Sequence, residues 1–133
     1  MRIFRNFEEA GVIKSPVVTT GMFDGVHIGH KVILRRLEKL AEECGGESVL
    51  TTFHPHPRAV LYPESSGKDL RLINTQEEKI ELLRKAGLEN VIIIEFTTAF
   101  ARTTSEEFVS RYLCGMLKAK IIVVGKNHHF GFN

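Results

Sequence analysis

Short apolar runs alternate along this chain with longer segments in which apolar residues recur at helical spacing. Residues 17–20 form one short, β-branched run, which predicts a buried strand. The segment that follows, residues 28–44, carries an apolar stripe with the helical period, formed by Val32, Ile33, Leu37, Leu40 and Ala41. This stripe predicts an amphipathic helix, which the glycine pair at residues 45–46 ends.

The same alternation continues through the rest of the chain. Further strands are predicted at residues 48–53, 91–96 and 120–125. Further helices are predicted at residues 75–86 and 104–117. Strands that alternate with helices predict an α/β fold, in which a parallel sheet has helices on both of its faces.

Local features set the ends of the two later helices. Each begins with a capping box, formed by Thr75 with Glu78 in one helix and by Thr104 with Glu107 in the other. A glycine at residue 87 ends the helix at residues 75–86. Residues 55–67 contain prolines and show no periodicity, so we expect a loop there.

Three segments that contain candidate site residues each follow a predicted strand. They are residues 23–30, 54–58 and 127–131. Because the chain leaves parallel strands at the same edge of a sheet, and ligands bind beyond the carboxyl ends of such strands, we expect the three segments to meet. We expect His27, His30, Pro55, Asn127 and Phe130 to line one open cleft there.

Composition excludes several classes of function. The 133 residues suffice for one domain with its own core, and 43% apolar and 26% charged residues are ordinary for a globular protein. A net charge of +2 gives no sign of a nucleic-acid patch, and residues 91–94 and 121–124, the longest apolar runs, are too short to span a membrane.

The charged and sulfur-containing residues point to an ordinary cytoplasmic protein. Lys79, Arg84 and Lys85 share a helix with several glutamates, which predicts a solvated face. Cys44 and Cys114 form no C-x-x-C pair and no disulfide framework, so we expect reduced thiols. Charged residues follow Met1 at once, so no signal peptide is expected and the predicted location is the cytoplasm.

The decapeptide GMFDGVHIGH, residues 21–30, joins the first predicted strand to the first predicted helix. Glycines at this place let a ligand approach the backbone, and the positive end of a helix attracts phosphate groups. His27 and His30 lie three residues apart, so both imidazoles can point to one face of the first turn. The segment therefore suits the binding and reaction of a nucleoside triphosphate.

This decapeptide resembles the signature of the HxGH nucleotidyltransferases, and two further segments narrow the resemblance. TFHPHPR at residues 52–58 and VVGKNHHFG at residues 123–131 are similar to segments of the bacterial riboflavin kinase/FAD synthetases. The resemblance covers essentially the whole chain. It implies a Rossmann-like nucleotidyltransferase fold and the transfer of AMP from ATP to FMN, giving FAD and pyrophosphate, with Mg²⁺ carried by ATP.

The resemblance also implies roles for individual residues. The catalytic residues would be His27, His30 and Asn127. The residues that bind ATP would be Gly21, Phe23, Asp24, Gly25 and Gly29. The residues that bind FMN would be Pro55, Pro57 and Phe130.

Plainer interpretations stay open for some of these residues. Asp24 is equally a helix N-cap, Asn127 an Asx-turn after a strand, and Phe130 a core aromatic. His54, His56, His128 and His129 also suggest a transition-metal site, although no carboxylate or thiolate nearby in sequence completes a tetrahedral set. The expected protein-bound metal is therefore none.

The family pattern continues beyond FG with basic and glycine residues, a Ser/Thr-rich segment and a β-barrel riboflavin kinase domain. We therefore expect residues 1–133 to be an adenylyltransferase domain that is truncated at its C-terminus, without the kinase domain. Two alternatives stay open: another adenylyl- or cytidylyltransferase of the superfamily, and a nucleotide-binding module without catalysis. The protonation of the two histidines and the oligomeric state also stay open.

Overall fold

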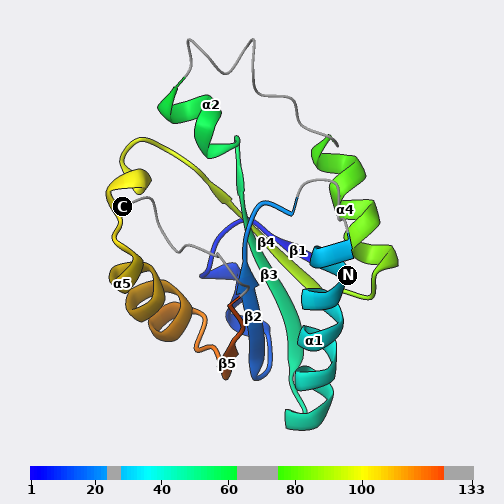
Figure 1. Cartoon of the computed structure of the whole chain (residues 1–133). Helices are drawn as coiled ribbons and strands as arrows, with labels where there is room; N and C mark the ends of the chain where they lie inside the picture. Colours follow the sequence, from blue (N-terminus) through cyan, green and yellow to red (C-terminus); the bar gives the residue numbers. More distant parts are fainter. Residues whose placement is uncertain (24–27, 63–74, 125–133) are drawn as a thin grey trace.

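The computed structural model describes residues 1–23, 28–62 and 75–124 (Figure 1). Its centre is a five-stranded sheet with the order β1-β4-β3-β2-β5, and every described pairing is parallel. The strands are β1 (Arg2–Phe4), β2 (Pro16–Thr20), β3 (Glu47–His54), β4 (Asn90–Glu95) and β5 (Ile121–Ile122). The predicted α/β architecture with a parallel sheet is confirmed.

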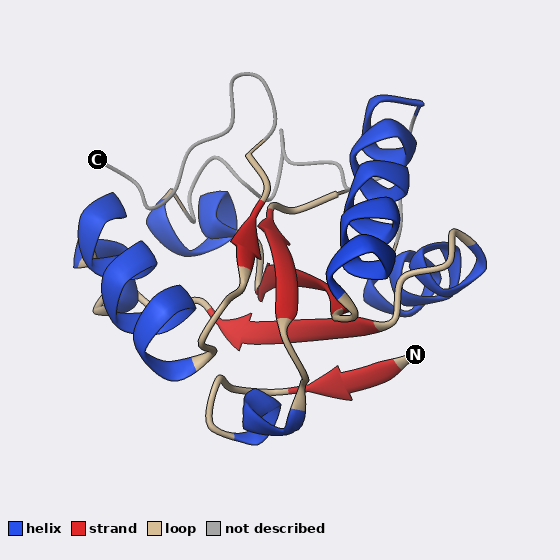
Figure 2. Cartoon of the chain, turned by 90° about the horizontal axis from the view of Figure 1, so that it is seen from below, coloured by secondary structure: helices blue, strands red, loops and turns tan. Residues whose placement is uncertain are grey.

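Helices cover both faces of the sheet, with α1 and α4 on one side and α5 on the other (Figures 1 and 2). The α-helices are α1 (Ile28–Cys44), α2 (Pro57–Leu61), α4 (Gln76–Lys85) and α5 (Ser105–Glu107). The tighter and wider turns are the 3₁₀-helices η1 (Glu9–Val12) and η3 (Phe100–Arg102) and the π-helix η4 (Phe108–Met116), which continues α5. No described helix is long and apolar enough to cross a membrane.

Alternating side chains of the central strands divide the core into two layers. Val18, Val49 and Ile92 point into the layer under α5 and η4, whereas Leu50 and Val91 point into the layer under α1 and α4. The first layer is rich in stacked and edge-on aromatic rings, among them Phe7, Phe53, Phe96, Phe100, Phe108 and Tyr112. Burial on both faces explains why the strands are continuous apolar runs in the sequence.

The ends of α1 and α4 follow the local rules of helix capping. After α1, Gly45 has a φ of 68° and the N–H of Gly46 donates to the carbonyl of Ala41 at 2.8 Å, so the predicted glycine stop is confirmed. At the start of α4, Thr75 and Glu78 form the predicted capping box in both directions.

Three local predictions need correction. The expected loop at residues 55–67 contains α2, because the His56 side chain accepts from the backbone N–H of Arg58 and Pro57 occupies the first helical turn. The expected helix at residues 104–117 keeps its Thr104 cap but widens into η4, which brings Phe108 and Leu113 onto the sheet. Strand β1 was not predicted, since it has three residues and buries only Phe4.

Candidate functional site

The carboxyl ends of the described strands lie together, as the alternation of strands and helices predicts. Gly21 continues directly from β2, and its N–H donates to the carbonyl of Thr51 in β3 at 3.0 Å. Pro55 follows β3, and β3 pairs with β4 up to the pair His54–Glu95. The first two chemistry-bearing segments therefore share one edge of the sheet.

The turn after β2 has a strained backbone and an aromatic anchor. Phe23 has a φ of 52°, which is uncommon for a bulky residue, and its side chain is buried. Its ring stacks on the imidazole of His30, with the ring centroids 4.4 Å apart and the planes at 12°. His30 lies in the first turn of α1, directly after Gly29. The stacking thus fixes the plane of the imidazole beside the helix N-terminus.

Lys79 of α4 contacts the same turn. Its ammonium donates to the carbonyl of Met22 at 2.9 Å and to the hydroxyl of Thr52 at 3.2 Å. The residue is only 2% exposed, so the prediction that it belongs to a solvated face is wrong. The missed indication was its spacing from Leu83, four residues on, which puts both on the buried side of α4.

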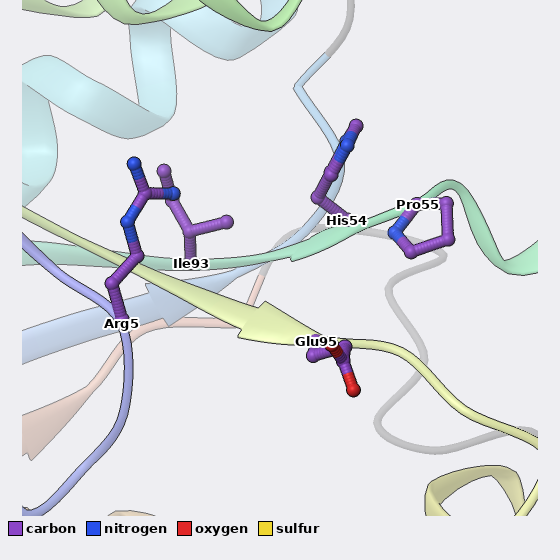
Figure 3. A pocket seen from close by; sticks show the side chains of 5 residues that line it. All are labelled: Arg5, His54, Pro55, Ile93 and Glu95. Carbon is purple, nitrogen blue, oxygen red and sulfur yellow. The ribbon is translucent and has the colours of Figure 1, made fainter.

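A cavity of about 340 Å³ lies at the same carboxyl edge of the sheet (Figure 3). The described residues that line it come from the ends of three strands: Arg5, His54, Pro55, Ile93 and Glu95. Ile93 belongs to the same buried cluster as Phe23, so the cavity and the strained turn lie on the face of the sheet that α1 and α4 cover. The cavity combines one cationic, one acidic and one imidazole group with an apolar floor.

Sequence reasoning expected Pro55 to line the site and the segment that begins at His54 to lie at this edge, but it assigned His54 no role in the cleft and missed Arg5 and Glu95. Each of the two missed residues stands at or just after the carboxyl end of a strand. The rule that ligands bind at this edge would have found Glu95. It would not have found Arg5, because β1 itself was not predicted.

The structure places part of the predicted site. Gly21, Phe23, Gly29, His30 and Pro55 lie at the expected edge. Pro57 is buried in the first turn of α2 and does not line the cavity, because α2 directs it toward the protein interior. The remaining predicted residues lie outside the described residues: Asp24, Gly25, His27, Asn127 and Phe130.

The described residues offer few ligands for a resident metal ion. No three of their His, Cys, Asp and Glu side chains lie close enough together to hold one. His54 lines the cavity, and the ring of His56 caps α2, so these two residues have separate surroundings. His128 and His129 lie outside the described residues.

Comparison with known proteins now adds to this geometry. The family model described as FAD synthetase matches residues 11–133. A "Bifunctional riboflavin kinase/FMN adenylyltransferase" of Bacillus subtilis is 35% identical over 115 residues, which cover 86% of this chain and 35% of that protein. A "FAD synthetase" of Listeria monocytogenes is 37% identical over 120 residues, which cover 89% of this chain and 46% of that protein.

A solved structure has the same fold. The crystal structure titled as a macrolide-efflux protein from Streptococcus pneumoniae superposes with a TM-score of 0.83 at 32% sequence identity. The match covers 98% of this chain and 42% of that chain. The chain therefore spans less than half the length of each of these three relatives.

Proposed function

Because this chain belongs to the FAD synthetase family, we propose that it transfers the AMP group of ATP to the phosphate of FMN, giving FAD and pyrophosphate. The observation that carries the proposal is the position of His30, in the first turn of α1 and stacked on Phe23 directly after β2. A helix N-terminus and an oriented imidazole are what a triphosphate requires at that place.

The attacking group needs little activation. The phosphate of FMN is largely ionised at neutral pH, because its second pKa is near 6. The protein must instead align the phosphate with the α-phosphorus of ATP and offset the negative charge that collects on the transferring group and on pyrophosphate. We assign the second task to His30, to His27 and to the N–H groups at the start of α1. ATP enters as its Mg²⁺ complex, with the ion on the phosphates.

The other predicted roles follow the same division of the site. Gly21, Phe23 and Gly29, with Asp24 and Gly25, receive ATP, and Asn127 lies on the side of its phosphates. The flavin lies toward Pro55 and the adjoining cavity, with Phe130 as an aromatic wall. Pro57 takes part only through α2, whose first turn it forms. Arg5 and Glu95 extend the assignment, as charged groups that meet the polar parts of FMN.

We further propose that the natural protein also carries a riboflavin kinase domain and works in the bacterial cytoplasm. The support is the name and greater length of the Bacillus relative. The efflux activity named for the pneumococcal structure is not part of the proposal, since the family model and the curated relatives match the segments that carry the phosphate-binding motif.

The test is a direct assay of the intact protein with ATP, Mg²⁺ and FMN, in which FAD is separated by chromatography and pyrophosphate is measured. We expect FAD and pyrophosphate in equal amounts. Replacing FMN by pantetheine phosphate or glycerol phosphate addresses the alternative transferases of the superfamily. Turnover of one of these compounds without any formation of FAD would contradict the flavin assignment, and binding of ATP without any turnover would favour the non-catalytic alternative.

A further inference from the structure

We propose that Lys79 is the positioning residue of the nucleotide site: its hydrogen bonds hold the turn at residues 21–23 in the strained form that receives the phosphates. This inference rests on the proposed function, because it assigns a role within the same site. Lys79 matches none of the sequence motifs that identify the family in this chain. It stands instead on α4, which supplies no other residue to the predicted site.

The contacts of Lys79 join three parts of the molecule. From α4, its ammonium donates to the carbonyl of Met22, after β2, and to the hydroxyl of Thr52, near the end of β3. Thr52 pairs in register with Ile93, which lines the cavity. One buried cation therefore contacts both the turn proposed for ATP and a strand residue that pairs with the lining of the cavity proposed for FMN.

The hydrogen bond from Lys79 to Met22 also affects the position of His30, because Met22 is bonded to Phe23 and the ring of Phe23 stacks on His30. Met22 precedes Phe23, whose positive φ is unfavourable for an aromatic residue and persists only where the surroundings hold it. The ring of Phe23 carries the imidazole of His30 by stacking at 4.4 Å. Lys79 thus anchors the residue before the strained one, and His30 stacks on the ring of the strained residue itself.

Stability alone gives poor reason for a lysine at this position. Taking an ammonium group out of water is costly, and a methionine of similar length would pack against the neighbouring Leu83 without that cost. A lysine supplies what methionine lacks: hydrogen-bond donors for the carbonyl of Met22, in the turn after β2, and for the hydroxyl of Thr52 in β3. These bonds fix the shape of the turn, and that shape matters to a ligand that binds there.

The test compares Lys79→Met with Lys85→Met in the intact protein. Lys85 stands on the exposed side of the same helix and serves as the matched control. Isothermal titration calorimetry with inorganic tripolyphosphate and, separately, with FMN measures the two halves of the site. Far below the melting temperature, we expect Lys79→Met to weaken tripolyphosphate binding about tenfold, as for the loss of a hydrogen bond to a charged group. The affinity for FMN should change much less, and Lys85→Met should match the wild type.

A purely structural lysine would give a different pattern. It would shift the melting temperature of Lys79→Met and leave the tripolyphosphate affinity of the folded protein unchanged, which would overturn the inference. Equal losses for tripolyphosphate and FMN would overturn it as well, since they would indicate general damage to the site.

If Lys79→Met does not fold, Thr52→Val decides instead. This variant keeps the charge and removes one of the two acceptors that aim it. We expect about a threefold loss of tripolyphosphate affinity, and an unchanged affinity would overturn the inference. The proposed function fails separately, if the wild-type protein makes no FAD from ATP, Mg²⁺ and FMN.

Discussion

Polar side chains are arranged differently at the two edges of the sheet. At the amino edge, where β1, β3 and β4 begin, the side chains satisfy one another. Arg2 donates to Asn90 at 3.1 Å and to Glu47 at 2.7 Å, and the amide of Asn90 donates to the carbonyl of Ser48 at 3.1 Å. Glu89 completes the network by accepting from Ser48.

The carboxyl edge has no such network among the described residues and instead combines several features that are costly to stability. It has a buried lysine, a phenylalanine with positive φ and an open cavity with charged walls. Buried charge and backbone strain reduce stability, and they persist in proteins mainly at functional sites. The comparison teaches that the amino edge holds the strands in register, whereas the carboxyl edge keeps groups available for a ligand. The variants below, with Lys79→Met above, test this division and the stability of the sheet between the two edges.

The largest effect is expected at the carboxyl edge, on turnover. His30→Ala should lower the rate of FAD formation about a hundredfold or more, because in the proposed mechanism the imidazole stabilises charge that develops only during transfer. FMN binding, followed by quenching of flavin fluorescence, should change little. Equal losses in rate and binding would contradict the assigned role, and so would the absence of any loss.

The next largest effect is expected at the amino edge, on stability. Asn90→Ala should lower the free energy of unfolding by about 1–3 kcal/mol, because Asn90 is fully buried and its partners in Arg2 and Ser48 lose their bonds. Urea denaturation measures this loss. The rate of FAD formation by the folded variant should equal that of the wild type. A slower reaction with unchanged stability would break the division between the edges.

The amino edge should also contribute to the pH dependence of stability in acid. Burial raises the pKa of Glu47, but hydrogen bonds from the Lys14 backbone, from Asn90 and from Arg2 outweigh it and hold the pKa below its ordinary value of 4.5. The unfolded chain therefore binds the proton more readily. The stability from Glu47 is complete above pH 4.5 and is lost as the pH falls through the lower, folded-state pKa.

Glu47→Gln tests this pH dependence. Urea denaturation should show a smaller loss of unfolding free energy below pH 4.5 in the variant than in the wild type. If the unfolding free energies of the variant and the wild type fell in parallel as the pH is lowered, Glu47 would not be the group responsible. Turnover near neutral pH should not respond, since the residue lies at the edge opposite the site.

The smallest effect is expected for a buried threonine of β3. The hydroxyl of Thr51 has no hydrogen-bond partner among the described residues, whereas the hydroxyl of Thr19 donates to the carbonyl of Val123 at 2.8 Å. Thr51→Val should leave the free energy of unfolding unchanged or raise it by up to about 1 kcal/mol, while Thr19→Val should lower it by about 1 kcal/mol. Equal changes in urea denaturation would contradict this contrast.

Much of the fold could be predicted because it depends on neighbours in the sequence. The period of the apolar stripe and the glycine pair after it set both ends of α1, which matches the predicted residues 28–44. The alternation of strands and helices sets the parallel sheet, and with it the edge at which Gly21, His30 and Pro55 meet.

What could not be predicted depends on partners that are distant in sequence. Strand β1 forms because it pairs with β4, and this pairing brings Arg5 to the cavity. Helix α2 was missed for a different, local reason: the side chain of His56 caps a helix of only five residues, which is too short for a period to show.

Lys79 shows the limit most clearly. By sequence it is one charged residue among others on an amphipathic helix, and the local pattern predicts a solvated face. Its ammonium is buried because it meets the carbonyl of Met22, which is 57 residues away along the chain. The sequence by itself determined most of the elements, their order and the edge at which the motif of residues 21–30 begins, since periodicity and capping are local. Only the tertiary structure decided which buried charge supports that motif, because hydrogen bonds between distant segments exist only after the sheet has brought them together.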